Sequence, residues 1–223
     1  MIAIIDYGMG NIHSVNKALQ VFGADTLVTN KPEDIRNCEK AVLPGVGAFD
    51  DAMQELEKQG LIAVINEHVK NKKPFLGICL GMQLLFEGSE EAKSAKGLGI
   101  LKGRVARFSD KNAIKVPHIG WNQLKIGSGL RASATRRGGL ANLYGGQGLK
   151  VCPLLKDIAD GSYVYFCHSY YAEPKDRKDI AATCDYGADF TSVVWQGNIY
   201  GVQFHPEKSQ AVGLKILENF VNL

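Results

Sequence analysis

Short apolar runs alternate with helix-like patterns through the first half of the chain. Runs at residues 2–5, 26–28, 41–43 and 74–78 have the length and composition of buried strands. Between them, apolar residues recur every three or four positions, which predicts helices at 12–22, 50–59, 61–71 and 80–86. Asn11 is placed to begin the first helix, and Gly60 separates the second from the third. This alternation predicts an α/β fold in which helices flank a mostly parallel central sheet.

The second half is richer in short β-prone segments, at residues 105–108, 164–167, 181–184, 193–196 and 199–204. The dipeptide Gly197-Asn198 between the last two segments is typical of a hairpin turn. Residues 211–221 have the pattern of a closing amphipathic helix. We therefore expect additional antiparallel strands in the C-terminal half, and a single domain over residues 1–223.

Residues 127–150 depart from this pattern. The segment is rich in Gly, Ala and Arg and contains no Asp or Glu. An exposed insertion in the domain is the simpler interpretation. A basic binding loop is the alternative, although aromatic interleaving there is limited to Tyr144.

Composition narrows the class of protein. Of the 223 residues, 45% are hydrophobic and 22% are charged, as in globular proteins, and the net charge of +3 is too small to indicate nucleic-acid binding. No apolar run approaches the roughly 20 residues that a bilayer requires, and the start of the chain lacks the basic region of a signal peptide. We expect a cytoplasmic protein that binds neither nucleic acid nor membrane.

The sequence also predicts no cofactor and no metal site. Five widely spaced cysteines without a CxxC pair favour reduced thiols over a disulfide framework or a thiolate metal site. A Walker A pattern and a paired HxxxH signature are both missing. The dinucleotide-like Gly8-Met9-Gly10 lacks its third glycine, because position 13 is His13.

Cys79 is the candidate nucleophile. It lies in the sequence GICLG at residues 77–81, between a predicted strand and a predicted helix. This is the pattern of a nucleophile elbow, with Cys in place of Ser. A sharp turn there projects the side chain above the sheet, and the amide groups and positive end of the following helix favour a thiolate.

A thiol nucleophile needs a base, and the base needs a partner that orients it. His205 and Glu207 supply this pair, since Pro206 is expected to keep the segment extended and residues two apart then face the same side. His13, His68, His118 and His168 are the alternative bases. Of these, His68 lies in a helical pattern and is expected to be solvated.

Acyl transfer also requires donors that stabilise an oxyanion. The glycine-rich sequence PGVG at residues 44–47 follows a predicted strand and can present backbone N–H groups from Gly45, Val46 and Gly47. The N–H of Leu80, directly after the nucleophile, is the natural second donor.

These motifs resemble those of class I, or triad, glutamine amidotransferases. The resemblance is carried by GICLGMQ at residues 77–83 and GVQFHPEKS at 201–209. Within that class, DYGMGN at 6–11, PHIGWN at 117–122 and HSYY at 168–171 resemble the glutaminase subunits of imidazole glycerol phosphate synthases, which act in histidine biosynthesis. The insertion at residues 127–150 departs from that pattern.

The resemblance implies a reaction and a site. Cys79 would attack the side-chain amide of L-glutamine, a thioester would form, and ammonia and then glutamate would leave. His205 would move protons, and Glu207 would orient it. The resemblance further places substrate contacts at Gln83, Glu91, Ser169 and Tyr170.

It also implies a partner, a separate (β/α)₈-barrel cyclase subunit that receives the ammonia in a heterodimer. Trp121, Asn122 and Lys208 resemble positions at that interface, although Trp121 is equally consistent with core packing. Three alternatives stay open: another ammonia-using pathway, a non-catalytic homologue, and a cysteine peptidase.

Overall fold

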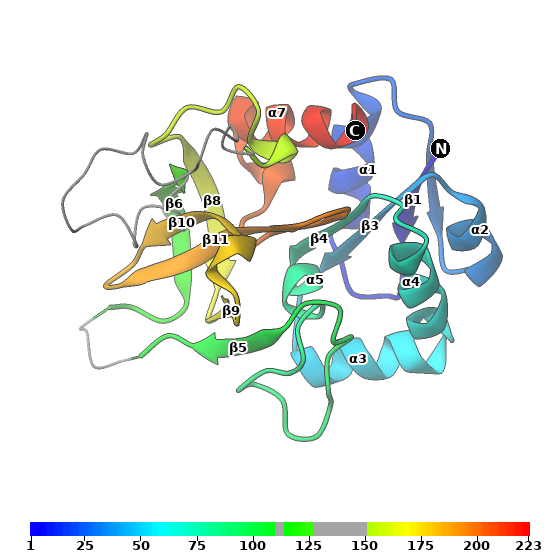
Figure 1. Ribbon diagram of the computed structural model, residues 1–223, viewed down its shortest axis with the longest axis horizontal. Coiled ribbons are helices and arrows are strands. Elements are labelled where there is room, and N and C mark those ends of the chain that lie inside the picture. Colours follow the sequence, from blue (N-terminus) through cyan, green and yellow to red (C-terminus); the bar gives the residue numbers. More distant parts are fainter. Residues whose placement is uncertain (110–113, 127–150) are drawn as a thin grey trace, which may run out of the picture.

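The computed structural model describes residues 1–109, 114–126 and 151–223 (Figure 1). Among these residues, ten strands form one large sheet and two more form a small antiparallel sheet beside it. The predicted insertion at 127–150 lies outside the described residues, and the expectation of a single domain stays a prediction. Within the described ranges, no helix combines the length and the apolar character that crossing a bilayer requires.

The first half supplies most of the parallel part of the large sheet, as the alternating pattern predicts, and one strand comes from near the C-terminus. The order of this parallel part is β2-β1-β3-β4-β12, and each neighbouring pair is parallel. The strands are β1 (Ile2–Ile5), β2 (Thr26–Thr29), β3 (Lys40–Gly45), β4 (Phe75–Cys79) and β12 (Ile199–Val202).

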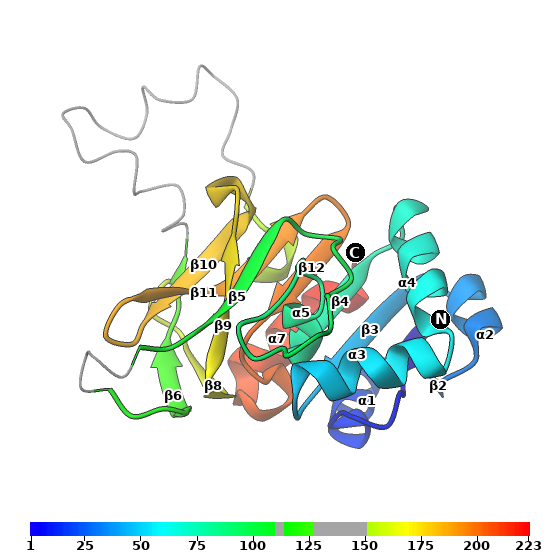
Figure 2. The same cartoon turned by 90° about the horizontal axis from the view of Figure 1, so that it is seen from below.

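Helices cover both faces of this parallel part, because its strands are apolar on both sides (Figure 2). In β1, Ile2 and Ile4 pack toward α1 (Ile12–Gln20) and α7 (Gln210–Val221). Ala3 and Ile5 pack toward the opposite layer. That layer contains α2 (Pro32–Asn37), α3 (Phe49–Lys58), α4 (Leu61–Lys70) and α5 (Leu80–Gln83).

The second half continues the sheet with antiparallel strands, also as predicted. A two-residue turn, Gly197-Asn198, joins β11 (Asp189–Gln196) to β12, so the chain enters the parallel part by a hairpin. The remaining strands are β10 (Ile180–Asp185), β7 (Lys125–Ile126), β9 (Tyr170–Pro174) and β5 (Gly103–Arg107). The small sheet pairs β6 (His118–Gln123) with β8 (Tyr163–His168).

Several predicted elements were wrong in extent. The strand predicted at 193–196 begins at Asp189, and the helix predicted at 12–22 ends at Gln20. The helix after Cys79 ends at Gln83 instead of residue 86, because Leu85 and Phe86 bond to carbonyls three residues back and tighten the chain into turns. The last β-prone segment ends at Val202 instead of residue 204, where the sheet gives way to the loop before α7. The sequence pattern also missed β6, β7, β9 and α2.

The backbones of β3, β4 and α5 approach one another so closely that side chains cannot fit between them. A Cβ atom on Gly81 would lie 1.8 Å from the carbonyl oxygen of Leu43, and one on Gly77 would lie 2.6 Å from the carbonyl oxygen of Gly81. Gly77 and Gly81 are therefore required, because no larger residue fits at either position. They allow α5 to begin directly above the sheet.

Replacing Gly81 by alanine should destabilise the fold by at least about 3 kcal/mol, because the added methyl group must displace backbone atoms. Gly88→Ala is the matched control, since a Cβ at Gly88 meets no atom within 4 Å, and it should change stability by less than about 0.5 kcal/mol. Urea unfolding of both variants measures the difference. Equal stabilities would contradict the packing argument.

Candidate active site

Cys79 ends β4 and stands directly before α5. Its backbone has φ +54° and ψ −112°, a left-handed conformation that is strained for a residue with a side chain and costs about 1–3 kcal/mol. The close backbone packing at Gly77 and Gly81 holds Cys79 in this conformation. This is the sharp strand-to-helix turn that the GICLG sequence predicts. Because α5 has a single turn, the free N–H of Leu80 is the main group that the helix offers beside the sulfur.

His205 and Glu207 come from the loop between β12 and α7. The ring Nδ1 of His205 lies 3.0 Å from Glu207 Oε1, and both side chains are almost fully buried. The prediction that this segment is extended was wrong, because Pro206–Lys208 form a short 3₁₀ turn. Proline suits the first position of such a turn. The carboxylate reaches the imidazole across this turn instead.

The charge state of His205 depends on its neighbours. Burial lowers its pKa, but the hydrogen bonds and negative charges of Cys79 and Glu207 outweigh burial and raise the pKa to about 10. His205 is therefore an imidazolium at neutral pH, and it lies beside the Cys79 sulfur, with which it can exchange a proton. Its contribution to stability is complete below the ordinary pKa near 6.5 and is lost as the pH rises through about 10.

Asn11 contacts the same carboxylate oxygen of Glu207 as His205 does. Its Nδ2 donates to Glu207 Oε1 at 3.0 Å, across 196 positions of sequence. Asn11 precedes α1, as predicted, but its side chain binds Glu207 instead of capping the helix. The sequence analysis missed this role, although Asn11 is part of the DYGMGN motif.

Two glutamines link the pocket wall to the sulfur. Gln83 Nε2 donates to the Tyr170 carbonyl at 2.9 Å and to Gln203 Oε1 at 3.1 Å. Gln203 Nε2 in turn lies 3.8 Å from Cys79 Sγ, within hydrogen-bond reach of sulfur. Gln203 is fully buried, and its part in the site was not predicted. Its place in the sequence GVQFHPE, two residues before His205, was the available signal.

A pocket of about 340 Å³ opens over the sulfur. Most of the residues that the sequence assigns to the site line it: Val46, Gly47, Cys79, Leu80, Gln83, Glu91, Ser169, Tyr170, His205 and Lys208. Gly45 lies beneath the pocket, where a Cβ atom would come within 2.8 Å of the Gly81 amide nitrogen. Glu207 stands behind His205.

Glu91 gives the pocket a carboxylate. Its Oε2 accepts from the Phe49 amide at 3.0 Å. Burial raises the pKa of this carboxyl group, and the charges of Asp50 and Asp51 raise it further, against the lowering effect of the Phe49 hydrogen bond. A cation bound next to Glu91 would therefore stabilise the charged form of this carboxylate.

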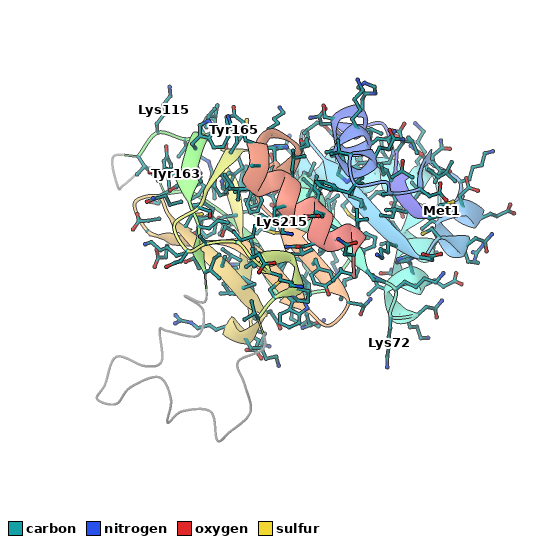
Figure 3. The ribbon with its side chains drawn as sticks, turned by 90° about the horizontal axis from the view of Figure 1, so that it is seen from above. Met1, Lys72, Lys115, Tyr163, Tyr165 and Lys215 are labelled. Atoms are coloured by element: carbon teal, nitrogen blue, oxygen red, sulfur yellow. The ribbon has the colours of Figure 1, made fainter. Side chains whose placement is uncertain are left out.

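The outer face of β6 and β8 is apolar and exposed. Ile119, Trp121 and Tyr163 are 58%, 46% and 54% exposed, and the strand register places them on one face with Tyr165 and Cys167. Tyr163 and Tyr165 lie on the side of the molecule where α7 runs, labelled in Figure 3. Trp121 is thus a surface residue, and Cys167 connects its face to the pocket.

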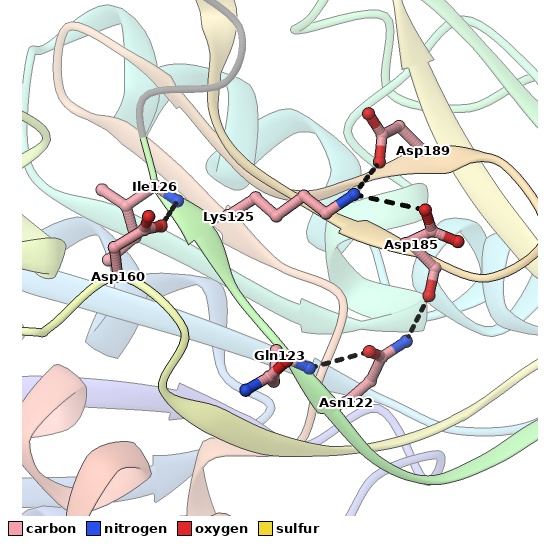
Figure 4. Close-up of polar contacts among 7 residues, drawn as sticks. All are labelled: Asn122, Gln123, Lys125, Ile126, Asp160, Asp185 and Asp189. Carbon is pink, nitrogen blue, oxygen red and sulfur yellow. Dashed lines mark hydrogen bonds and ion pairs between the residues drawn. The ribbon is translucent and has the colours of Figure 1, made fainter.

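Asn122 faces the opposite side of β6 from Trp121. Its Nδ2 donates to the Asp185 carbonyl at 2.8 Å, and its Oδ1 accepts from the Gln123 amide at 2.7 Å (Figure 4). Lys125 then ties the same edge to Asp185 and Asp189. The role of Asn122 as a partner contact stays a prediction.

Of the four alternative bases, His168 alone lines the pocket over Cys79, and its Nδ1 is bonded to the Tyr170 carbonyl. His13 is exposed on α1. His68 is buried against Cys38 and the Pro74 carbonyl, so the expectation that it is solvated was wrong. His118 and His168 are buried and bonded to each other, with Nδ1 of His118 3.1 Å from Nε2 of His168.

Burial lowers the pKa of His118 to about 4 and that of His168 to about 3. Since both values lie below the ordinary pKa near 6.5, these residues stabilise the fold above that pH, and the stabilisation is lost as the pH falls toward 4 and 3. His118→Asn should therefore reduce the slope of the free energy of unfolding against pH, between pH 6 and 4.5, by about 1 kcal/mol per pH unit. Urea titrations measure it, with exposed His13→Asn as control. Parallel slopes for wild type and His118→Asn would contradict the assignment.

Comparison with known proteins gives consistent results. The sequence matches the glutamine amidotransferase class-I family over residues 3–223. The imidazole glycerol phosphate synthase subunit HisH of Syntrophotalea carbinolica is 45% identical, over 99% of this chain and 98% of that protein. The subunit of the same name from Geobacter sulfurreducens is 46% identical, over 98% and 97%. A crystal structure of a glutamine amidotransferase superposes with a TM-score of 0.70 at 15% identity, over 100% and 99% of the two chains, a likeness of fold alone.

Proposed function

Because the chain belongs to the class-I glutamine amidotransferase family, we propose that it is the glutaminase subunit of an imidazole glycerol phosphate synthase. It hydrolyses L-glutamine and passes the ammonia to a separate cyclase subunit in histidine biosynthesis. The observation that carries the proposal is the buried set of Cys79, His205 and Glu207 at the base of a pocket. Similarity to HisH proteins over nearly the whole chain supports the pathway.

The first half of the reaction forms a thioester. The Cys79 sulfur, which lies beside the His205 imidazolium, attacks the side-chain amide carbon of glutamine. The carbon–nitrogen bond then breaks, and the imidazolium gives its proton to the leaving nitrogen, so that ammonia departs. Glu207 fixes the ring orientation and supports its positive charge while Asn11 holds Glu207.

The second half releases glutamate. Neutral His205 takes a proton from water, the hydroxyl oxygen attacks the thioester carbon, and the carbon–sulfur bond breaks. The thiolate and imidazolium are restored together. The negative oxygen that forms in both halves is stabilised by backbone N–H groups of Leu80 and of the segment containing Gly45, Val46 and Gly47.

The pocket is suited to the head group of an amino acid. Both hydrogens of the Gln83 amide are used within the protein, so its Oε1 is the atom left to accept from a substrate ammonium. The Glu91 carboxylate supplies a matching negative charge. Ser169 and Tyr170 also line the pocket, and we assign them to the glutamine site.

The exposed face of β6 and β8 is the docking surface for the cyclase subunit, a (β/α)₈ barrel. Three large apolar side chains, those of Ile119, Trp121 and Tyr163, are exposed to solvent there. An exposed apolar patch of this kind is typical of a protein–protein interface. Cys167 and Lys208 border the pocket beside this face. Ammonia leaving Cys79 can then enter the partner directly, before water protonates it and removes its nucleophilic lone pair.

Glutamate release from L-glutamine, measured with and without the cyclase subunit and its nucleotide ligand, tests the proposal. We expect hydrolysis that rises when the cyclase is added. Cys79→Ala should lower the rate by roughly four to six orders of magnitude, because the nucleophile is lost. Cys167→Ala is the matched control, since this thiol lines the same pocket, and it should keep the rate within a few-fold.

The assay also separates the alternatives. Glutaminase activity that responds to a different synthase would move the protein to another pathway. A complex that releases no glutamate would favour a non-catalytic homologue, and cleavage of casein would indicate a peptidase. Full activity in Cys79→Ala would remove Cys79 from the mechanism.

Trp121→Ala should weaken binding of the cyclase subunit by roughly 30-fold or more, because exposed aromatic residues at the centre of an interface carry much of its affinity. Val21→Ala serves as the control, since Val21 is also apolar and exposed but lies at the end of α1. Isothermal titration calorimetry gives both dissociation constants. An unchanged value for Trp121→Ala would place the interface elsewhere.

A further inference from the structure

Two buried imidazoles lie next to the active site, and the mechanism uses neither of them. His118 is on β6 and His168 ends β8, and the strand register places the two directly opposite each other. They are 3% and 6% exposed. Aromatic rings surround the pair, namely Phe108, Phe166, Tyr186 and Phe190.

This aromatic surrounding keeps both rings neutral. Burial lowers the pKa of each far below 7. For His168, the hydrogen bond to the Tyr170 carbonyl opposes burial in part, and the neighbouring imidazoles of His118 and His205 lower the pKa further. A neutral imidazole has one N–H donor and one bare nitrogen acceptor. The hydrogen bonds around the pair therefore decide which nitrogen carries the proton.

The contacts allow a single arrangement of these protons. The Tyr170 carbonyl can only accept, so His168 donates to it from Nδ1, at 2.8 Å. Nε2 of His168 is then bare and accepts from Nδ1–H of His118 at 3.1 Å. The bare Nε2 of His118 accepts from Asn122 Nδ2 at 3.4 Å. Asn122 is itself fixed in this orientation by Asp185 and Gln123 (Figure 4).

The hydrogen bonds from Asn122 through His118 and His168 end at the Tyr170 carbonyl oxygen, which also belongs to the active site. The Tyr170 carbonyl accepts from His168 and also from Gln83 Nε2. Gln83 uses its second hydrogen on Gln203, and Gln203 donates to Cys79 Sγ. One carbonyl oxygen thus joins the imidazole pair to the amides that contact the sulfur.

We propose that His118 and His168 are positioning residues for glutamine hydrolysis. Through fixed tautomers they hold the Tyr170 carbonyl in the orientation that places Gln83 in the pocket and Gln203 against Cys79. The inference rests on the proposed glutaminase function and adds two residues to its machinery. His168 also lines the pocket, whereas His118 does not, and neither imidazole exchanges a proton during the reaction.

Two substitutions at one position separate positioning from packing. In His168→Asn, the amide nitrogen takes the place of Nδ1 and can still donate to the Tyr170 carbonyl. In His168→Gln, the amide reaches the place of Nε2 beside His118, and the donor to Tyr170 is lost. Both variants remove the ring, so both lose a similar amount of packing.

We expect His168→Gln to lower kcat for glutamine in the complex at least tenfold, and His168→Asn to stay within about threefold of wild type. The second readout needs no substrate: the rate at which iodoacetamide alkylates Cys79, followed by peptide mass mapping, should fall in His168→Gln and recover in His168→Asn. Thermal unfolding of the two variants should be alike.

His118 supplies a second pair should either variant fail to fold. His118→Asn keeps a δ-position donor for His168, whereas His118→Leu removes it, and the same order of rates is expected. Equal kcat and equal alkylation rates within each pair, or rates that simply follow thermal stability, would overturn the inference. Absence of glutamate release in the wild-type complex would instead count against the proposed function, and the alkylation rates would still test the positioning of Cys79.

Discussion

The left-handed backbone of Cys79 is the constraint on which the rest of the site depends. A residue with a side chain avoids this conformation unless its surroundings enforce it. Here the enforcement comes from backbone atoms: Gly77, Gly81 and the Leu43 carbonyl lie too close together for any Cβ atom. The strain at Cys79 is thus balanced by packing below it. Cys79 is consequently buried at the end of β4 and still borders the pocket.

The parallel part of the sheet brings the other groups to the same place. Gly45 ends β3 and Cys79 ends β4, while His205 follows β12, so the carboxyl ends of three adjacent parallel strands meet at one edge. Asn11, which follows β1, closes the set by its hydrogen bond to Glu207. Residues from both ends of the chain therefore fix the orientation of one imidazole. The antiparallel strands add the pocket wall and the exposed apolar face.

Local patterns in the sequence were sufficient for the elbow and for most strands and helices, because glycine spacing and apolar periodicity act over a few residues. The positions of Cys79, His205 and Glu207 followed from short motifs of this kind. Gln203 and Asn11 were not predicted to act in the site, since their contacts span 124 and 196 positions and depend on strand order. Strand β6 was missed because a histidine and an asparagine occupy its buried face, where their hydrogen bonds replace the expected apolar alternation.

The central claim is that one particular sulfur, activated by His205, reacts with the amide carbon of glutamine. The most direct measurement is peptide mass mapping after treatment of the cyclase complex with diazo-oxo-norleucine, an electrophilic analogue of glutamine. The account predicts a single adduct on Cys79, formed more slowly when glutamine is present. An adduct on the exposed thiol of Cys167, or a Cys79 that stays unmodified while the complex hydrolyses glutamine, would contradict it.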